Sequence, residues 1–552
     1  MTRMRPTFSF LTLSLLAASF AATAQELPRI LQDGQATPYL PDFSYAGYEF
    51  GLASLPAPRG KIIDVSDHGA VADDALDDSK AVLAALEAAH AVRGPVRLRF
   101  PAGRFILSEV LPISRSDIAI EGAGQGDGGT ELYFPRPLRM IDKSDRLAVL
   151  RGYLVDNDKR QLEPRANIDE PFSEYSWSGG FLWIKAPGID AGEEYGAASE
   201  RIEGAAVATG VRGETTVVLS QPTGLEVGDV VSIRWASTRG RDSGLLTELF
   251  GDHAHEAGSR MWENPERAIV VQTTRIEAID GTEVRIADPL LHAIGEAVPA
   301  EIEPWRGLTE VGIRDLAIVF PEGQDFGHHL EQGWNGIYMT DVFNGWIHSV
   351  RVSNADSGVL TYNSGNLTIR DVRTEGVRKA HYSVHIGSVH NALVSGLQVH
   401  NPVRHALSVN TRATRSVFQR ATVWQDPVID QHAGANHQNL FDDITFHVQA
   451  RRANGKAVYP LWDGSGASYW QPGHGRFNTH WNLRVIVDSG AAPDEPVLLQ
   501  GLEEGPEARL VGISGNRRFE VDYRPAPYTE MLNEAVHAAP SLYDWQLARR
   551  RR

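Results

Sequence analysis

The feature that most constrains this chain is a repeat of short apolar segments between residues 313 and 443. Six segments share it and begin at Ile313, Ile347, Ile369, Val394, Phe418 and Phe441, with steps of 34, 22, 25, 24 and 23 residues. Apolar and polar residues alternate inside the segments, which is strand spacing rather than helix spacing. A period near 23 residues built from strands is typical of a parallel β-helix, whose coils pack on one another. A β-sandwich with regularly spaced strands is the alternative.

The N-terminus predicts the compartment. Arg3 and Arg5 precede an apolar run from Phe8 to Ala22, and Ala22 and Ala24 form a small-x-small cleavage pattern. This is the layout of a secretory signal peptide, so we expect residues 1–24 to be removed and the protein to be exported, either periplasmic or secreted. The apolar run is too short to span a bilayer comfortably, so no membrane insertion is expected.

Charge and cysteine content exclude several classes of partner. The 552-residue chain carries a net charge of −17, which argues against nucleic acid and anionic membrane surfaces as partners. An anionic polysaccharide remains compatible, because a groove can be locally basic on an acidic protein. The chain has no Cys, which excludes disulfides and thiolate metal sites.

We expect six regions along the chain. They are a signal peptide at 1–24, an N-terminal extension at 25–60, the start of the β-helix with its cap at 61–139, an inserted antiparallel β module with loops at 140–304, the main β-helix coils at 305–490, and a C-terminal segment with a basic tail at 491–552. The insertion is inferred because the repeat is lost there, and Asp280 and Gly281 between two strand-like runs predict a hairpin. Helices are expected at 79–91, as the cap, and at 528–538.

Several turns near the start of the chain carry a family resemblance. They are Gly69-Ala70, Asp77-Asp78, Pro101 to Gly103, and Gly122 with Gly124. In this order they resemble the first coils of the pectate-lyase-like superfamily of right-handed parallel β-helices, as found in exported bacterial members. The resemblance implies an all-β fold, a right-handed single-stranded parallel β-helix with an N-terminal cap helix and an inserted antiparallel β module. It also implies carbohydrate-active function.

Two later segments are similar to loops of the same superfamily. The first runs from Asp430 to Asp442 and includes His432 and His437; the second runs from Gly473 to Trp481 and includes His474 and Arg476. The resemblance implies that His432, His437, His474 and Arg476 face the substrate groove. The second segment departs from the usual pattern, since Pro472 precedes Gly473 and Phe477 stands where Trp is usual.

Polar side chains recur at matching offsets behind the repeated segments. The candidates come from three successive coils and are Arg378, Lys379, His381, Tyr382 and His385; Arg404, His405 and Asn410; Asp430 and His432. Aligning the Ser-Val pairs of the first two coils places His385 level with Asn410 and His381 within one position of His405. Histidine is the commonest general acid or base, and Asp can hold its tautomer. A purely structural ladder of stacked polar side chains is the alternative.

Three functions are compatible with these residues. A polysaccharide lyase acting on a uronic-acid-containing glycan would use Arg404 or Arg378 to neutralise the uronate. His405, His381 or His432 would be the base, and Tyr382 or another His would be the acid. A glycoside hydrolase would need paired carboxyl groups, for which Asp356, Asp426 and Asp430 are available. A non-catalytic glycan-binding solenoid is the third.

Aromatic residues and metals complete the sequence predictions. We expect Trp462 and Trp470 to be available for stacking on sugar rings. No cofactor is required by the sequence, no metal ligand is predicted, and Ca²⁺ stays open because some relatives use it. His328, His329 and Glu331 form a pattern that could bind a metal, but we interpret it as a solvated loop.

Overall fold

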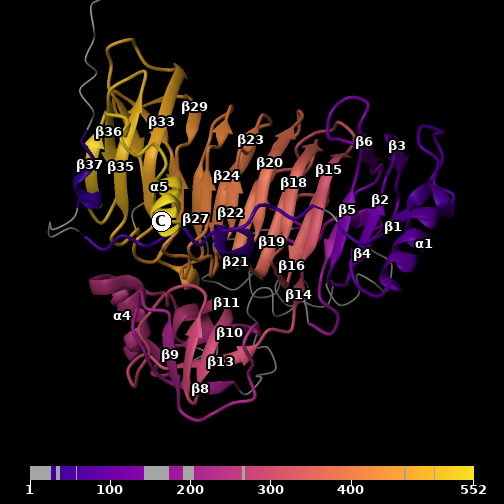
Figure 1. Ribbon diagram of the computed structural model, residues 1–552. Helices are drawn as coiled ribbons and strands as arrows, with labels where there is room; N and C mark the ends of the chain where they lie inside the picture. Colours follow the sequence, from indigo (N-terminus) through magenta and orange to yellow (C-terminus); the bar gives the residue numbers. More distant parts are fainter. Residues whose placement is uncertain are drawn as a thin grey trace, which may run out of the picture.

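The repeated segments form a stack of parallel strands, seen side by side in the computed structural model of Figure 1. The structure describes residues 26–32, 38–57, 59–141, 173, 175–189, 204–263, 268–464, 468–502 and 504–552. The predicted signal peptide lies outside them. Among the described residues, no helix combines the length and the apolar character needed to cross a membrane.

The solenoid has two main sheets. The 17-stranded sheet contains β1 (Lys61–Asp64), β2 (Val96–Arg99), β3 (Gly103–Ile106), β5 (Ile118–Glu121), β6 (Thr130–Tyr133), β15 (Val311–Val319), β18 (Trp346–Ser353), β20 (Thr368–Glu375), β22 (Leu393–Ser395), β23 (Gln398–Val399), β25 (Val417–Gln419), β26 (Thr422–Val423), β28 (Leu440–Asp442), β29 (Thr445–Gln449), β33 (Thr479–Ser489), β35 (Arg509–Gly515) and β37 (Tyr528–Leu532). The 10-stranded sheet contains β4 (Leu111–Ile113), β7 (Leu182–Ile184), β14 (Leu308–Thr309), β16 (Asn335–Thr340), β17 (Val342–Phe343), β19 (Ser357–Gly365), β21 (Ala380–His390), β24 (Val403–Asn410), β27 (Ile429–His432) and β32 (Trp462–Asp463). A small third sheet contains β30 (Arg451–Ala453), β31 (Lys456–Pro460), β34 (Val497–Gln500) and β36 (Phe519–Asp522).

The predicted repeat is confirmed residue by residue. Each of the six segments pairs in parallel with the next, through the column Ile313, Ile347, Ile369, Val394, Phe418 and Phe441. The 34-residue step contains an extra loop between β15 and β16, at residues 320–334. The fold is the expected right-handed parallel β-helix, and its inward apolar columns form one continuous core.

Each coil bends at single residues in the left-handed backbone region. One set, at the same offset in successive coils, is Glu310, Asn344, Asn366, Asn391, Arg415 and Gln438; a second set, five residues later, is Asp315, Ser349, Asp371, Gly396, Arg420 and Asp443. A positive φ turns the strand sharply without inserting a loop, and Asn, Asp and Gly adopt it at least cost. These corners bound the short strand of each coil and keep the columns in register.

The N-terminal cap helix is α1 (Ser79–His90), close to the predicted 79–91. The carboxylate of Asp77 accepts a hydrogen bond from the Ser79 amide at 2.8 Å, as expected for a residue at a helix start. Val82, Ala85, Leu86 and Ala89 are buried against the first coils. The helix therefore closes one end of the core (Figure 1).

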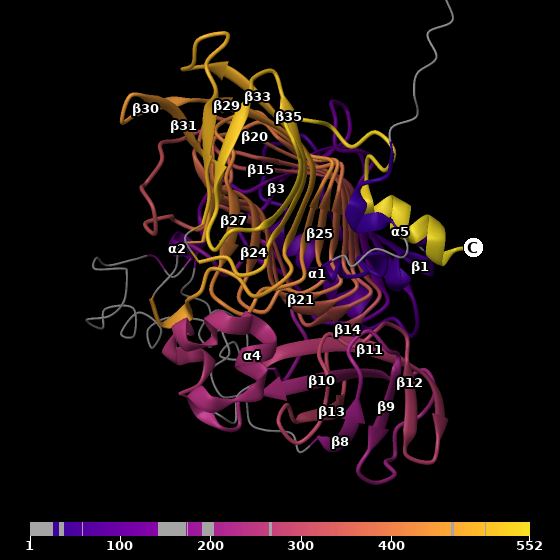
Figure 2. The same ribbon diagram turned by 90° about the vertical axis from the view of Figure 1, so that its left-hand side faces the viewer.

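The inserted module is a closed antiparallel barrel. Its strands are β8 (Ala205–Gly210), β9 (Thr216–Leu219), β10 (Val230–Ala236), β11 (Ala268–Asp280), β12 (Glu283–Ile286) and β13 (Ala300–Pro304). Asp280 pairs with Glu283 across the predicted hairpin. The barrel has its own apolar core and lies beside the coils, against the C-terminal ends of β19 and β21 (Figure 2).

The boundary predicted for the insertion at residue 140 is wrong. Strand β7, at Leu182–Ile184, pairs in parallel with β4 and with β16 and so belongs to the solenoid. The sequence did not show this, because a three-residue strand is too short for a periodic signal. The barrel itself begins at Ala205.

The segment between β10 and β11 is partly helical. It contains α4 (Gly244–Phe250), whose Leu245, Leu246, Leu249 and Phe250 are buried. The backbone amide of Arg476 donates to the Leu249 carbonyl at 2.8 Å. This helix therefore joins the barrel to the C-terminal coils.

A buried polar seam also joins barrel and solenoid. His390 Nε2 lies 2.8 Å from Asp288 Oδ2, and its Nδ1 lies 2.8 Å from Thr414 Oγ1. The fully buried Arg415 donates to the carbonyls of Pro289 and Leu290. The Thr–His–Asp order resembles a catalytic triad, but all three residues are buried, so the arrangement holds the two modules together.

The C-terminal segment differs from its prediction. Residues 528–538 were expected to form a helix, yet Tyr528–Leu532 is the strand β37, which pairs in parallel with β35. The solenoid thus continues past residue 490. The C-terminal helix is α5 (Leu542–Arg550), and its Arg550 donates to the Phe50 carbonyl, so the basic tail is docked.

Helix α5 and the N-terminal segment 38–57 together cover one face of the 17-stranded sheet (Figure 1). Their buried side chains pack on the column of Leu393, Val417 and Leu440 and on Trp481 and Val511, which stack in a neighbouring column two residues along the strands. The two ends of the chain therefore meet across five successive coils.

Asp442 connects α5 to this face and provides a test of the docking. Its carboxylate accepts from Ser541 Oγ at 2.6 Å and from the amides of Leu542 and Tyr543 at 2.9 and 3.1 Å. We expect Asp442→Ala to lower the free energy of unfolding by about 1–3 kcal/mol, because the first amides of the helix lose their acceptor. Hydrogen exchange should show faster exchange in α5, whereas Asp443→Asn, at the half-buried neighbour, should leave α5 protected.

Candidate functional site

A cluster of histidines lies where β21, β24 and β27 run side by side in the 10-stranded sheet. Tyr382 pairs with His405, and His385 is level with Ser408 and Asp430. Ring centroids of His405 lie 5.2 Å from His381 and 5.7 Å from His432. The structure thus brings together the histidines and the aspartate that the sequence placed on one face.

The predicted register within the cluster is wrong by two residues. His385 was expected level with Asn410, but Asn410 is level with Gly387 and His432. Paired residues of β20 and β23 are 25 positions apart in the sequence, whereas paired residues of β21 and β24 are 23 positions apart. The connection from β20 to β21 therefore holds two more residues than the connection from β23 to β24. Gly387 leaves room for the His385 ring, since a Cβ there would lie 2.4 Å from His385 Cε1.

Asp430 is the centre of the cluster and is fully buried. It accepts from Ser408 Oγ at 2.6 Å, and its other oxygen lies 3.0 Å from His432 Nδ1 and 3.6 Å from His405 Nδ1. Burial alone would lower the pKa of His432, but the charge of Asp430 and its hydrogen bond outweigh it and raise the pKa. His432 is therefore held in one tautomer with Nε2 away from Asp430.

The extra loop of the 34-residue coil completes the cluster. His328 lies with its ring centroid 4.9 Å from that of His381 and 5.5 Å from that of His405. Glu331 Oε1 lies 3.1 Å from His381 Nδ1, and its other oxygen accepts from Ser176 Oγ at 2.7 Å. The interpretation of this stretch as a solvated loop is wrong for Glu331, which is buried. His328 and Glu331 are thus site residues that the sequence prediction missed.

Burial sets the protonation of the deeper groups. It lowers the pKa of His381 and of His405 well below the ordinary value and raises the pKa of Glu331. It also raises the pKa of Tyr382, and the His381 ring stacks on this phenol at 4.3 Å. Tyr382 is thus a buried, protonated member of the cluster, and its role as the proton donor stays a prediction.

The three basic candidates have different surroundings. Arg404 is one-fifth exposed and donates to Asp325 Oδ2 at 3.1 Å, so it faces the surface beside the cluster. Arg378 is buried and donates to Asp356 at 3.2 Å and to the Pro321 carbonyl at 3.0 Å. Its predicted role in substrate binding is corrected to a structural one, because its charge is already paired. Lys379 is exposed, and its side chain makes no described contact with the cluster.

Apart from His432, the residues that these two loops were expected to add to the groove are structural. His437 Nε2 lies 2.8 Å from His292 Nε2 in the seam with the barrel. His474 is buried between the Gly475 carbonyl and the Tyr523 hydroxyl, both at 2.6 Å. Arg476 pairs with Glu507 at 2.6 Å. These residues hold the barrel and the C-terminal coils in place, which the family resemblance did not indicate.

Of the two tryptophans predicted to stack on sugars, Trp462 is buried and Trp470 is partly buried. Trp462 is in the solenoid core, and its Nε1 donates to His480 Nδ1 at 3.3 Å. Trp470 packs against the barrel core and lies near Arg260, which is 6.0 Å from its ring centroid. The predicted stacking on sugars is therefore corrected for Trp462, which is buried, and stays a prediction for Trp470.

Two sets of side chains in the cluster have the spacing of metal ligands. In the set His328, His381 and His405, and in the set His405, Asp430 and His432, one ligand atom per residue lies within 4.8 Å of the others. Imidazole nitrogen suits Zn²⁺ and similar transition metals, whereas Ca²⁺ prefers oxygen ligands. The donors of these two sets therefore suit a transition metal better than Ca²⁺, and the Ca²⁺ site that the sequence left open stays a prediction.

The fold and the site together define a right-handed parallel β-helix protein with a histidine-rich site on its 10-stranded sheet. No family model and no curated protein matches the sequence. Similar solved structures include the tailspike protein gp49 from Pseudomonas phage LKA1, with 13% identity, a TM-score of 0.46, and coverage of 85% of this chain and 81% of that chain. They also include DFA-IIIase from Arthrobacter chlorophenolicus A6 in complex with GF2 (12%, 0.37, 86% and 93%) and the A-module of the Azotobacter vinelandii mannuronan C-5 epimerase AlgE6 (14%, 0.30, 86% and 99%). The fold assignment rests on the strand pairing of this chain itself.

Proposed function

We propose that this protein is a carbohydrate-active enzyme that cleaves a uronate-containing glycan by β-elimination. The observation that carries the proposal is the pair of His432 and Asp430 beside Arg404. The His432 and Arg404 side chains are each about one-fifth exposed, at 21% and 20%, so both can meet a substrate. His405, the first of the three histidines predicted as the base, is almost fully buried.

The proposed reaction uses these groups in three roles. His432, oriented by Asp430, takes the proton from C5 of the uronate. The electron pair of the broken C5–H bond forms the C4–C5 double bond as the C4–O bond breaks. The leaving oxygen then takes a proton, which the His432 imidazolium can return, so protons and electrons balance. Arg404 exchanges Asp325 for the substrate carboxylate and neutralises its charge, which an always protonated guanidinium does at any working pH.

Glycoside hydrolysis is the second candidate, because Asp430 is level with Asp463 on the adjacent strand. Neighbouring strands lie about 4.8 Å apart, close to the roughly 5–5.5 Å between the carboxyl groups of retaining hydrolases. Asp430, however, is already engaged by Ser408 and His432. Of the other predicted carboxyl groups, Asp356 is paired with Arg378, and Asp426 is exposed.

A substrate screen tests the proposal. The full chain would be incubated with a panel of polyuronates, each beside a carboxyl-reduced form of the same polymer. We expect far-ultraviolet absorbance from a 4,5-unsaturated uronate, formed in step with new reducing ends and absent with the reduced polymers. Saturated reducing ends alone would support hydrolysis, and binding without any product would support a glycan-binding solenoid. Inversion at C5 without cleavage would also contradict elimination. The export predicted from residues 1–24 fits an enzyme that meets polysaccharides outside the cytoplasm.

A further inference from the structure

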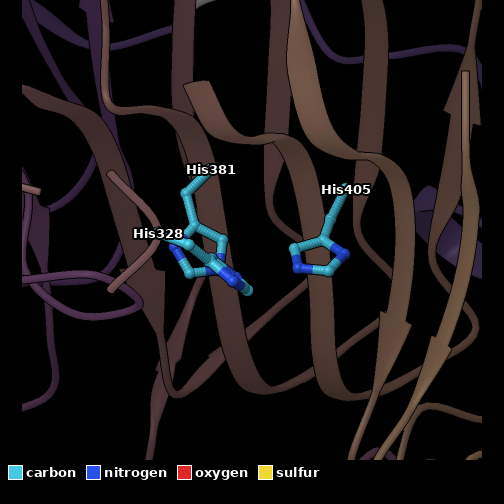
Figure 3. Close-up of side chains that lie close together, drawn as sticks. All are labelled: His328, His381 and His405. Atoms are coloured by element: carbon cyan, nitrogen blue, oxygen red, sulfur yellow. The ribbon is translucent and has the colours of Figure 1, made fainter. Parts of the chain in front are cut away.

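His328, His381 and His405 point toward one another from separate elements, as Figure 3 shows. His381 is the second residue of β21, His405 lies on β24, and His328 lies in the extra loop before β16. His328 is exposed, whereas the other two are buried. The set therefore has two fixed members and one that solvent reaches, so that an ion has a route of entry.

The rings are not arranged as a structural ladder. Where rings stack along this solenoid, their planes are nearly parallel, with 2° between Phe418 and Phe441 and 5° between Phe441 and His480. Between the three histidines the planes are inclined by 62°, 49° and 36°. Rings inclined in this way can turn their edges toward one another, and one nitrogen atom of each histidine lies within 4.8 Å of the others.

A carboxylate stands behind each of the two buried rings. Glu331 lies 3.1 Å from His381 Nδ1, and Asp430 lies 3.6 Å from His405 Nδ1. Hydroxyl groups of Ser176 and Ser408 hold these two carboxylates. An imidazole whose Nδ1 faces a carboxylate presents Nε2 on the opposite side, which is the usual second shell of a metal-bound histidine.

Neither buried ring is satisfied by its surroundings. Nδ1 of His381 and Nδ1 of His405 form no hydrogen bond of good geometry among the described residues, although each faces its carboxylate. Buried polar atoms without partners are uncommon and costly in native proteins. A cation on the Nε2 side would polarise the ring and strengthen the contact between Nδ1–H and the carboxylate.

We propose that His328, His381 and His405 form a binding site for a transition-metal dication of the Zn²⁺ type, oriented by Glu331 and Asp430. Three imidazoles leave a fourth tetrahedral position open, as in zinc sites that bind water or a substrate oxygen. The alternative set of His405, Asp430 and His432 is less suited, because Asp430 already accepts from Ser408 and His432. The inference does not rest on the proposed reaction, since it follows from the ligand geometry alone.

The test measures metal binding without reference to activity. The full chain, first dialysed against a chelator, would be titrated with Zn²⁺ by calorimetry and with Co²⁺ by visible absorption, which reports tetrahedral coordination. We expect one ion per chain. His328→Ala should weaken binding by more than about 100-fold, and Glu331→Gln by roughly 10- to 100-fold. His328 is exposed, so its variant should keep the parent unfolding curve.

His329→Ala is the matched control. His329 neighbours His328 on the same loop, and their rings stack at 3.7 Å, but it is outside the ligand set. Its replacement should leave the Zn²⁺ affinity nearly unchanged. The proposal is overturned if Zn²⁺ does not bind, if His328→Ala binds like the parent, or if His329→Ala loses as much. Loss on His432→Ala with retention on His328→Ala would assign the ion to the other set and equally overturn it.

Discussion

Replacing His432 by alanine is expected to lower the rate of uronate-glycan cleavage by roughly 10²- to 10⁴-fold, the usual contribution of a general base. The reason is geometric. Asp430 fixes Nδ1 of this ring at 3.0 Å, and the side chain is partly exposed, so Nε2 is the basic atom that a substrate proton can reach. Initial rates from the far-ultraviolet absorbance of the product would measure the loss.

His447→Ala is the matched control for this variant. His447 forms the same kind of pair, with Nδ1 3.2 Å from Asp488, and its side chain has the same 21% exposure, but it lies on the 17-stranded sheet. Its removal should leave the rate unchanged. Equal rates for His432→Ala and the parent would exclude His432 as the base. A loss shared by both variants would point to general destabilisation instead.

The protein should lose most of its stability as the pH falls from about 6.5 toward 5. His437, His474 and His480 are fully buried, and burial lowers the pKa of all three, for His474 to about 4. Their pKa in the unfolded chain is about 6.5, so the unfolded state binds more protons below that pH. Their contribution to the free energy of unfolding is complete above pH 6.5 and is lost as the pH falls below that value. Below pH 6.5 each of these histidines lowers the free energy of unfolding by about 1.4 kcal/mol per pH unit, so the three together lower it by about 4 kcal/mol per pH unit.

Buried carboxyl groups act in the opposite sense. Burial raises the pKa of Asp442 to about 7, so its contribution is present at low pH and is lost as the pH rises toward 7. Burial also raises the pKa of Glu331 and Asp356, which act in the same sense as Asp442. Burial lowers the pKa of further histidines, so that the buried histidines outnumber these carboxyl groups; they are His292, His381, His385, His390 and His405. The expected loss approaches the roughly 5–15 kcal/mol that hold a typical domain folded.

Urea unfolding at several pH values between 7.5 and 5 would measure this dependence. His474→Gln should reduce the slope by about 1.4 kcal/mol per pH unit, since one proton is removed from the balance. His255→Gln, at an exposed histidine, should leave the slope unchanged. A midpoint that does not move between pH 7.5 and 5 would contradict the expectation.

The coils could be predicted from the sequence because the same packing requirement recurs in each of them. An apolar residue at the position of Ile347 must stack on Ile313 and Ile369, and only a strand of fixed register satisfies that in every coil. The corners carry the same information, since Asn344, Asn366 and Asn391 adopt left-handed backbone at equal offsets. The corner residues and the stacked apolar residues thus recur with the same spacing, so the repeat can be recognised in the sequence.

The site was only partly predictable for the opposite reason. Two extra residues in the turn after β20 shift the register between the sheets, and no periodic signal marks such a change. His328 and Glu331 reach the cluster from a loop outside the repeat. His437 and His474 appear equally polar in the sequence, but the docked barrel and the C-terminal coils bury them. Contacts made by inserted segments depend on a docking that no spacing encodes.

The meeting of the two chain ends has a consequence for the order of assembly during synthesis. The bond from Arg550 to Phe50 joins residues 500 positions apart, and Tyr543 donates to the Ala46 carbonyl over 497. Coils of a solenoid can stack as they emerge, because each contacts only its neighbours. The N-terminal segment 38–57 covers only part of the face made by Leu393, Val417 and Leu440, and α5 covers the rest. Docking of α5 therefore sets the moment at which this apolar face is sealed, and a variant without residues 541–552 would carry part of it exposed.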